Sequence, residues 1–162
     1  MENGKKARCI LIAVDNYDSS EKSLEWALQN LYKGGDDLRL VHVVPVVGDP
    51  SPVVVDMALP FPLGPSPSTQ DLKRVEEAKD FIKERFDKIL TPREIPYTVE
   101  IVHFMVSTDN IGEIICKRAD SLKAHAVVLA KHQRGLLHEL FLGSVAKYVC
   151  GHCKQPVVVL HA

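Results

Sequence analysis

The sequence predicts an α/β protein with a five-stranded parallel sheet that is covered by helices on both faces. The main observation is that short apolar runs alternate with segments of helical periodicity from one end of the chain to the other. The last run, at 156–160, shows no polar alternation, as expected for a strand buried on both faces. A length of 162 residues is that of one domain, 1–162, which can bury a core without disulfides or metals. The expected architecture is therefore doubly wound and Rossmann-like.

Five strands and four helices are expected in alternation. Each strand is an apolar run rich in Val, Ile and Leu, and each helix repeats its apolar residues three or four positions apart. The strands are expected at 9–14, 38–44, 98–104, 126–130 and 156–160. The helices are expected from Asp18 to the Gly34-Gly35 pair, at 69–90, at 111–122 and from Gly143 to about His152.

Capping residues indicate where the helices begin. Asp18 and Glu21 have the spacing of a capping box, so the first helix should begin at Asp18. Asp109 or Asn110 should cap the third helix, and Ser144 the fourth. The Gly-Gly pair after the first helix should end it, because glycine accepts the left-handed conformation common at helix ends.

Residues 45–68 hold seven of the ten prolines and predict a long loop. Pro45 should end the second strand, since proline cannot donate to a sheet. Apolar patches at 53–55 and 57–61 argue against plain disorder. Two interpretations stay open, a partly packed lid or interaction segment and a mobile surface loop.

Composition excludes several classes of partner. Twenty basic and 21 acidic residues leave a formal net charge of -1, so no overall field attracts nucleic acid or a membrane surface. No apolar stretch approaches the roughly 20 residues of a membrane span, and the N-terminal Lys5-Lys6 leads directly into a strand-like run. We therefore expect a cytoplasmic protein, small enough to diffuse into the nucleus.

Four irregularly spaced cysteines predict reduced thiols rather than a disulfide framework. Cys9 and Cys116 fall in apolar segments and should act as small hydrophobic residues. Cys150 and Cys153 enclose Gly-His, the dithiol motif of disulfide isomerases. A reactive Cys-x-x-Cys pair lies at a helix N-terminus, whereas this pair ends a helix. A thiol oxidoreductase is thus a remote alternative.

The motifs of other enzyme classes are missing or incomplete. His138-Glu139 begins like a zinc-protease helix, but Leu142 stands where the second histidine belongs. The seven histidines show no metal-ligand spacing, so no metal site is expected. There is no Gly-x-Ser-x-Gly elbow or Walker lysine motif, and no evident general base for ATP hydrolysis. We expect no efficient enzyme.

A ligand site is expected where parallel strands end. In doubly wound sheets ligands bind beyond the carboxyl ends of the strands, where the winding direction changes. The segments that follow such ends are 15–17, 44–45 and 131–142. Asp15 is either a turn former or a carboxylate beside a bound purine or ribose. Gly143-Ser144 opens a helix whose free N–H groups suit an anion.

Five segments together resemble the universal stress protein family, especially its small single-domain plant members. Residues 12–15 (Ile-Ala-Val-Asp) and 19–28 are similar to the family's N-terminal Val-Asp, serine and Ala-Leu pattern. Residues 41–43 match the end of its second strand. The most specific matches are 142–149, which begin Leu-Gly-Ser-Val, and 154–159, which contain Pro-Val-Val-Val.

The resemblance implies an adenine-nucleotide site with an altered phosphate loop. ATP-binding members carry Gly, two residues, Gly, nine residues, Gly and then Ser or Thr, and here Ala130 and Gln133 replace the first two glycines. Glycine lets backbone N–H groups approach phosphate closely, so binding should be micromolar. The resemblance implies adenosine contacts from Ala13, Asp15 and Val43, and a phosphate path lined by Ala130, Gln133, Gly143, Ser144 and Val145. A shifted loop that turns at Gly135 would let the cations Lys131 and Arg134 contact phosphate oxygens and partly offset the missing glycines.

Two function hypotheses follow. The first is a non-catalytic module that binds ATP or AMP, with magnesium if the nucleotide carries it, and acts as a regulator or chaperone-like protein in stress response. The second is the same fold without nucleotide, acting as a dimeric interaction module. Both expect a homodimer through the strand Pro156 to Leu160, because an apolar edge strand needs cover, and a client protein that the sequence does not name. Neither expects nucleic acid or a membrane as partner.

Overall fold

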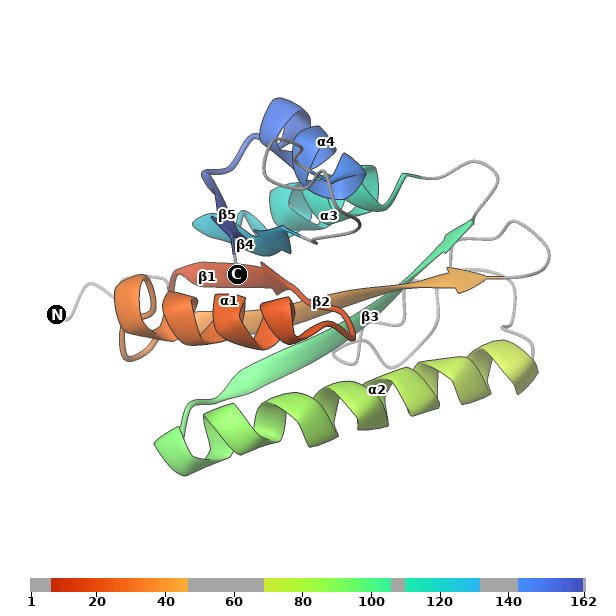
Figure 1. Cartoon of the computed structure of the whole chain (residues 1–162), viewed down its shortest axis with the longest axis horizontal. Helices are drawn as coiled ribbons and strands as arrows, with labels where there is room; N and C mark the ends of the chain where they lie inside the picture. The colour runs from red at the N-terminus through yellow and green to blue at the C-terminus, as the bar shows by residue number, and fades with distance from the viewer. Residues whose placement is uncertain (1–6, 47–68, 106–109, 132–142, 162) are drawn as a thin grey trace, which may run out of the picture.

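A computed structural model describes residues 7–46, 69–105, 110–131 and 143–161. Its centre is a five-stranded sheet in the order β3-β2-β1-β4-β5, with every neighbouring pair parallel (Figure 1). The strands are β1 (Cys9–Ala13), β2 (Asp37–Val46), β3 (Tyr97–Met105), β4 (Ala126–Lys131) and β5 (Val157–His161). The helices are α1 (Asp18–Asn30), α2 (Thr69–Leu90), α3 (Ile111–Leu122) and α4 (Ser144–His152), with a 3-10 turn η1 (Thr91–Arg93) after α2.

The predicted doubly wound fold is confirmed. From β1 the chain runs outward through β2 to β3, then crosses back to β4 and β5 on the other side of β1. The winding direction therefore changes between β1 and β4, which are paired with Ile12 opposite Val128. In folds of this kind that junction is where ligands bind, beyond the carboxyl ends of the strands.

The helices cover the two faces of the sheet in separate pairs (Figure 1). On one face, α1 and α2 pack on alternate strand residues such as Ile12 and Leu40, with Leu24 and Phe86 fully buried from the helices. Burying a side chain of this size stabilises the fold by about 1.5–3 kcal/mol. On the other face, α3 and α4 cover the intervening strand residues, including Leu11 and Leu129. Period-two alternation thus divides each strand between two cores.

The α3/α4 face also holds a buried charge cluster. Glu100 on β3 is 4% exposed. Its carboxylate accepts from Arg39 Nη1 on β2 at 2.6 Å and also from Arg118 Nε on α3. Two cations flank one buried carboxylate, and Asp37 takes a further bond from Arg39 at 2.9 Å. A buried ion pair is costly to break because it leaves the partners desolvated, so this cluster fixes α3 against β2 and β3.

Two predicted boundaries are wrong. Pro45 does not end the second strand, since β2 continues to Val46 and pairs Pro45 with Phe104. A proline fits there because β1 has already ended opposite Val41, so β2 has a neighbour on one side only. The first helix ends at Asn30, before the Gly34-Gly35 pair, and Gly35 instead supplies a turn with φ +89°. The loop at 47–68 lies outside the described residues.

The predicted caps are partly correct. Asn110 caps α3, because its side chain accepts from the Gly112 N–H at 2.8 Å. Asp18 is not a cap: Tyr17 is the N-cap of α1, without a side-chain cap bond, and Asp18 is the first helical residue. Ser144 likewise begins α4, and its N-cap is Gly143. None of the described helices is long and apolar enough to cross a membrane.

Candidate functional site

Five of the predicted site residues lie at the carboxyl edge of three adjacent strands. Ala13 is the last residue of β1, and Asp15 follows two positions later. Val43 is on β2 beyond the end of β1, while Ala130 and Lys131 end β4. Because β1 lies between β2 and β4, the sheet brings these five residues to the junction where the winding changes.

The turn between β1 and α1 is wound tightly around Asp15. Its Oδ1 accepts from the Ser20 hydroxyl at 2.8 Å and from the Tyr17 N–H at 3.0 Å. The Ser20 hydroxyl in turn accepts from the Asp15 N–H at 3.0 Å, and Ser20 is 1% exposed. The structure thus gives Asp15 the role of turn former, one of its two predicted roles. The same hydrogen bonds hold this carboxylate in a fixed place at the carboxyl edge of the sheet.

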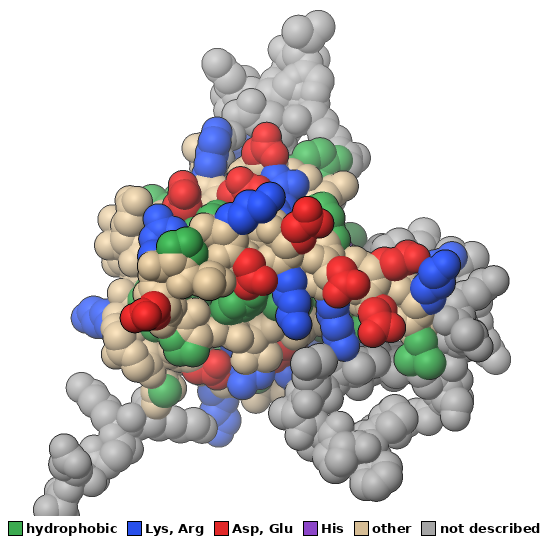
Figure 2. All heavy atoms as spheres, turned by 90° about the horizontal axis from the view of Figure 1, so that it is seen from below, with side chains coloured by type: hydrophobic (Ala, Val, Ile, Leu, Met, Phe, Trp, Pro, Cys, Tyr) green, Lys and Arg blue, Asp and Glu red, His purple; other side chains and the backbone are tan. Residues whose placement is uncertain are grey.

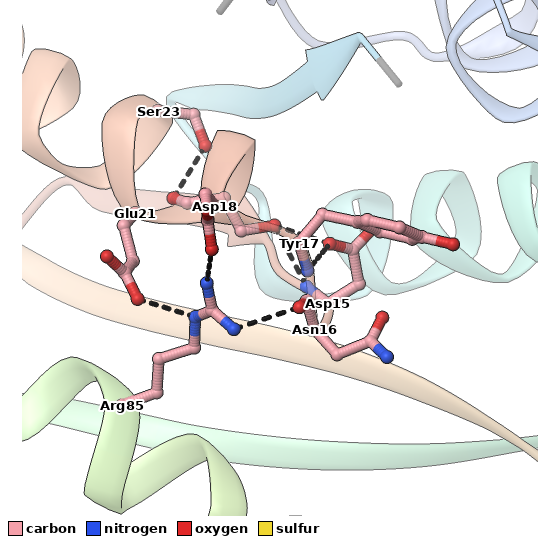
Figure 3. Close-up of polar contacts among 8 residues, drawn as sticks. Asp15, Asn16, Tyr17, Asp18, Glu21, Ser23 and Arg85 are labelled. Atoms are coloured by element: carbon pink, nitrogen blue, oxygen red, sulfur yellow. Dashed lines mark hydrogen bonds and ion pairs between the residues drawn. The ribbon is translucent and has the colours of Figure 1, made fainter. Parts of the chain in front are cut away.

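Arg85, on α2, holds the same turn from outside (Figure 3). Its Nη1 donates to the Asn16 carbonyl at 2.9 Å, and its Nη2 donates to Asp18 Oδ1 at 2.5 Å. Its Nε lies 2.6 Å from Glu21 Oε1, a contact that is an ion pair rather than an aligned hydrogen bond. The Arg85 side chain is only 17% exposed, so this planar cation is largely enclosed by its partners.

The β2 side of the edge is joined to the β1 turn by backbone contacts. The Val14 N–H donates to the Val41 carbonyl at 2.9 Å, which extends the pairing beyond the end of β1. The His42 ring Nδ1 lies 2.8 Å from the Val14 carbonyl oxygen. Val43, the predicted adenosine contact, is half-buried and packs against the α3/α4 core. Val41 and His42 therefore hold the turn that contains Asp15 against β2.

The phosphate side of the predicted site is described in part. Ala130 and Lys131 are 7% and 4% exposed, so both are packed into the sheet. Ala130 has no positive φ, so alanine at this position needs no strained backbone. Gln133 and Arg134 lie outside the described residues.

The N-terminus of α4 points toward the same edge of the sheet. The helix ends at His152, shortly before β5. The chain between them reaches the beginning of β4, since the Pro156 carbonyl accepts from the Val127 N–H, so the end of α4 lies at the amino edge of the sheet. The first residues of α4 must therefore lie toward the carboxyl edge. Gly143, the N-cap, has φ -57° and ψ 156°, and a Cβ there would meet nothing within 4 Å. The N-cap residue Gly143 has no side chain that could cap this end, and Ser144 is exposed.

The thiol motif is where the sequence predicted it. Cys150 lies in the last turn of α4 and Cys153 is the residue after the helix, so both are at the negative end of the helix dipole. Cys150 is exposed, whereas Cys9 is buried, and burial raises the pKa of the Cys9 thiol to about 11. No group of three or more His, Cys, Asp or Glu residues within the described ranges could hold a metal ion.

The surface around α2 carries charges of both signs (Figure 2). Acidic and basic side chains are interspersed over this face. On α2 itself, Lys73 and Glu77 form an ion pair one turn apart. This mixture agrees with the overall balance of 20 basic and 21 acidic residues. Such a surface produces no strong field of one sign.

Comparison with protein families gives a match over nearly the whole chain. The model of the universal stress protein family matches residues 6–161. The chain belongs to the universal stress protein family. The resemblance seen in the sequence is thereby confirmed, together with the doubly wound sheet that it implies.

The curated relatives that match this chain have low sequence identity to it. Universal stress protein PHOS32 of Arabidopsis thaliana is 29% identical over 94% of this chain. The alignment covers 64% of PHOS32, so the chain spans about two thirds of that relative. Solved structures share the fold at lower identity. A universal stress protein from Burkholderia pseudomallei has a TM-score of 0.63 at 18% identity, with 98% and 99% of the two chains covered.

A second solved structure is a complex with a nucleotide. The universal stress protein from Archaeoglobus fulgidus was determined with dAMP, and its fold matches this chain with a TM-score of 0.62 at 20% identity. The alignment covers 94% of this chain and 96% of the archaeal one. At this identity the likeness establishes the shared fold.

The sequence analysis missed two residues that shape the β1–α1 turn, Ser20 and Arg85. Ser20 is one of a pair of serines near the start of α1, and only the fold shows that it turns back to Asp15. Arg85 lies 67 residues from Asp18, on a helix whose charged face appears solvated in the sequence. Nothing local marks it.

Proposed function

We propose that this protein binds an adenine nucleotide at the carboxyl edge of β1 and β4 and acts as a non-catalytic, stress-responsive regulatory module. The observation that carries the proposal is the preformed β1–α1 turn, in which Ser20 and Tyr17 hold the Asp15 carboxylate and Arg85 holds the adjoining Asn16 carbonyl, at the junction of the two halves of the sheet. Membership of the universal stress protein family supports it, as does the dAMP complex of the archaeal relative.

The proposed site has a nucleoside side and a phosphate side. On the nucleoside side, Ala13, Asp15 and Val43 contact the adenosine, with Asp15 facing the ribose or purine. The fixed turn supports this role because a preformed contact costs little conformational entropy on binding. On the phosphate side, the candidates are Ala130, Lys131, Gln133, Arg134, Gly143, Ser144 and Val145.

The start of α4 fits an anion better than any other feature of the phosphate side. The N-cap residue Gly143 has no side chain to cap the first N–H groups, and the positive end of the helix dipole favours a phosphate there. A Cβ on Gly143 would meet nothing within 4 Å, so the space beside the start of this helix is open to a ligand. Magnesium, when the nucleotide brings it, would neutralise phosphate charge, and no step of the proposal depends on it.

Calorimetric titration tests the proposed function. Nucleotide-free protein should bind ATP, ADP and AMP with micromolar dissociation constants and should bind GTP more weakly. Denaturing protein purified from its source and identifying released nucleotide by chromatography gives an independent readout. Absence of heat with all three adenine nucleotides, together with no released nucleotide, would contradict the proposal and favour the nucleotide-free interaction module.

We also propose that the protein forms a homodimer through the outer edge of β5. Val157, Val158, Val159 and Leu160 are all only half-buried at this edge, although each packs against one of the two cores. An apolar edge strand invites pairing with another strand, and a two-fold axis would cover both edges at once. Light scattering should give the mass of a dimer at tens of micromolar. A monomer at that concentration would contradict this proposal.

A further inference from the structure

Helices α3 and α4 lie side by side over the sheet and touch at successive turns (Figure 1). At the first turn of α3, a Cβ on Gly112 would lie 2.8 Å from the Cβ of Tyr148 on α4, so the two backbones approach closely. Two turns later, Asp120 accepts from Lys154 at 2.7 Å and from the Gln155 side chain at 3.4 Å. Residues 112, 116 and 120 share one face of α3, because they are four apart.

Cys116 occupies the middle turn of this contact, and it faces Cys153. Both side chains are half-buried and both pack against the same apolar core. The Cys153 Sγ donates to Gln155 Oε1 at 3.3 Å, and Cys153 is near enough to the Cys116 thiol to raise its pKa. Gln155 donates in turn to Asp120, so the thiol pair belongs to a chain of contacts that joins the two helices.

The surroundings of Cys116 suit the second step of a disulfide exchange. Burial, followed by the nearby Cys153, raises the pKa of the Cys116 thiol. A buried thiol that stays protonated near neutral pH is a poor first nucleophile. We therefore assign the first attack on an oxidant to Cys153 and the second step to Cys116.

We propose that Cys116 and Cys153 form an intramolecular disulfide when the protein meets a peroxide, which makes this pair a redox-modification site. This pair joins α3 to the residue that follows α4, and it is distinct from the Cys150-x-x-Cys153 motif that the sequence suggests. Cys150 is exposed on the last turn of α4, whereas Cys153 is directed into the contact with α3.

The chemistry needs one equivalent of hydrogen peroxide or an alkyl hydroperoxide. The Cys153 thiolate attacks one peroxide oxygen, so that an S–O bond forms, the O–O bond breaks and water or an alcohol leaves. Cys153 is then a sulfenic acid. The Cys116 sulfur gives up its proton and attacks the Cys153 sulfur. The S–S bond forms, the S–O bond breaks, and the proton leaves with the hydroxyl as water. Two thiols are oxidised and one peroxide is reduced.

The disulfide would tie the middle of α3 to the segment between α4 and β5. It would close a loop that contains β4 and α4, and cross-links of this length restrict the unfolded chain. We expect the oxidised protein to unfold at a temperature higher by about 5 °C or more. Because β5 begins four residues after Cys153, oxidation would also stiffen the approach to the proposed dimer edge.

Peptide mapping under non-reducing conditions tests the proposal. The protein is treated with hydrogen peroxide, digested and analysed by mass spectrometry. A linked peptide containing Cys116 and Cys153, lighter than its two parts by two hydrogen atoms, is expected in the wild type. The Cys150→Ser variant should give the same link, whereas Cys116→Ser and Cys153→Ser should not.

Three results would overturn the proposal. They are a Cys150–Cys153 link in the wild type, sulfinic acid on Cys153 without a cross-link, or no oxidation while circular dichroism shows a folded protein. If a serine variant fails to fold, the map of the wild type still decides between these outcomes. A melting temperature that is equal before and after cross-linking would contradict the expected stabilisation.

Discussion

The N-termini of α1 and α4 reach the same edge of the sheet but are built differently. At α1, the preceding turn is held by the Asp15 carboxylate, the Ser20 hydroxyl and the Arg85 guanidinium, and two acids stand in the first turn. At α4, the N-cap is Gly143, which has no side chain to cap the helix, and the first turn has no acidic residue.

The difference indicates how the proposed site divides its work. Negative side chains at α1 already complement the positive end of that helix. That end therefore has little to gain from a phosphate. The start of α4 has the opposite character, because its first turn has no acidic residue that would repel an anion at the helix N–H groups. We infer that the α1 turn holds the nucleoside and that α4 receives the phosphates. The predictions below challenge this division, beginning with the largest effect.

Removing the Asp15 carboxylate should damage the nucleoside side most. Asp15→Ala leaves the Tyr17 N–H and the Ser20 hydroxyl without their acceptor. We expect adenosine and ATP to bind about 100-fold more weakly, a loss of about 2.7 kcal/mol. Calorimetry measures both constants. Asp15→Asn, which keeps an acceptor oxygen, should lose much less. A folded Asp15→Ala protein with wild-type affinity would remove Asp15 from the site.

A carboxylate placed at α4 should affect the phosphate side alone. Ser144→Asp puts a negative charge in the first turn, where it complements the dipole and repels a phosphate. We expect ATP to bind about tenfold more weakly while adenosine binds as before. Thermal unfolding should show equal or slightly higher stability. The matched control is Ser144→Ala, which adds no charge. An equal loss for ATP and adenosine would break the proposed division.

Loosening the Arg85 contacts should have a moderate effect. Arg85→Ala removes the bond to the Asn16 carbonyl and the pairing with Asp18 and Glu21, although Asp18 is largely exposed and its pair is worth little. We expect a loss of about 1–2 kcal/mol in denaturant unfolding and a few-fold weaker binding of adenosine.

The conservative variant separates positioning from stability. Arg85→Lys keeps the charge but cannot make the forked contacts, so it should recover stability better than affinity. If adenosine affinity is unchanged in both variants while stability falls, Arg85 supports only the fold.

A methyl group at Gly143 should have the smallest effect. Its φ of -57° suits any residue, and a Cβ would meet nothing within 4 Å. Gly143→Ala should change unfolding free energy by less than about 1 kcal/mol and ATP affinity by less than about twofold. The control is Gly112→Ala, where the Cβ meets Tyr148, and which we expect to cost about 1–3 kcal/mol. A large loss of ATP binding in Gly143→Ala would show that phosphate backbone contact is closer than the account allows.

The fold was predictable because its signals are local. Apolar runs and helical periodicity depend on neighbouring residues, so the strands and helices agree with expectation to within a few residues at most ends. The prediction that Pro45 ends the second strand was wrong. A proline is tolerated in β2 there because β1 ends opposite Val41, and that depends on the arrangement of the sheet rather than on the local sequence. Asp18 matched a capping box, yet its partner is Arg85 on another helix.

The site was predictable only in outline. The strand ends around Ala13 and Ala130 follow from topology and are where the sequence placed them. The contacts that hold Asp15 depend on Ser20 and on Arg85, which lies 69 residues beyond its Asn16 partner. Cys116 and Cys153 are 37 positions apart and meet only because α3 and α4 pack together. No pattern in one sequence reports such pairs.

The central claim is tested most directly by titrating adenosine, AMP and ATP into the same nucleotide-free protein. If α1 holds the nucleoside and α4 receives the phosphates, adenosine should bind measurably, and each added phosphate should tighten binding to a total of about tenfold for ATP. The tightening should weaken as salt is raised, because it is electrostatic. Equal constants for adenosine and ATP at low salt, or heat from neither ligand, would contradict the account.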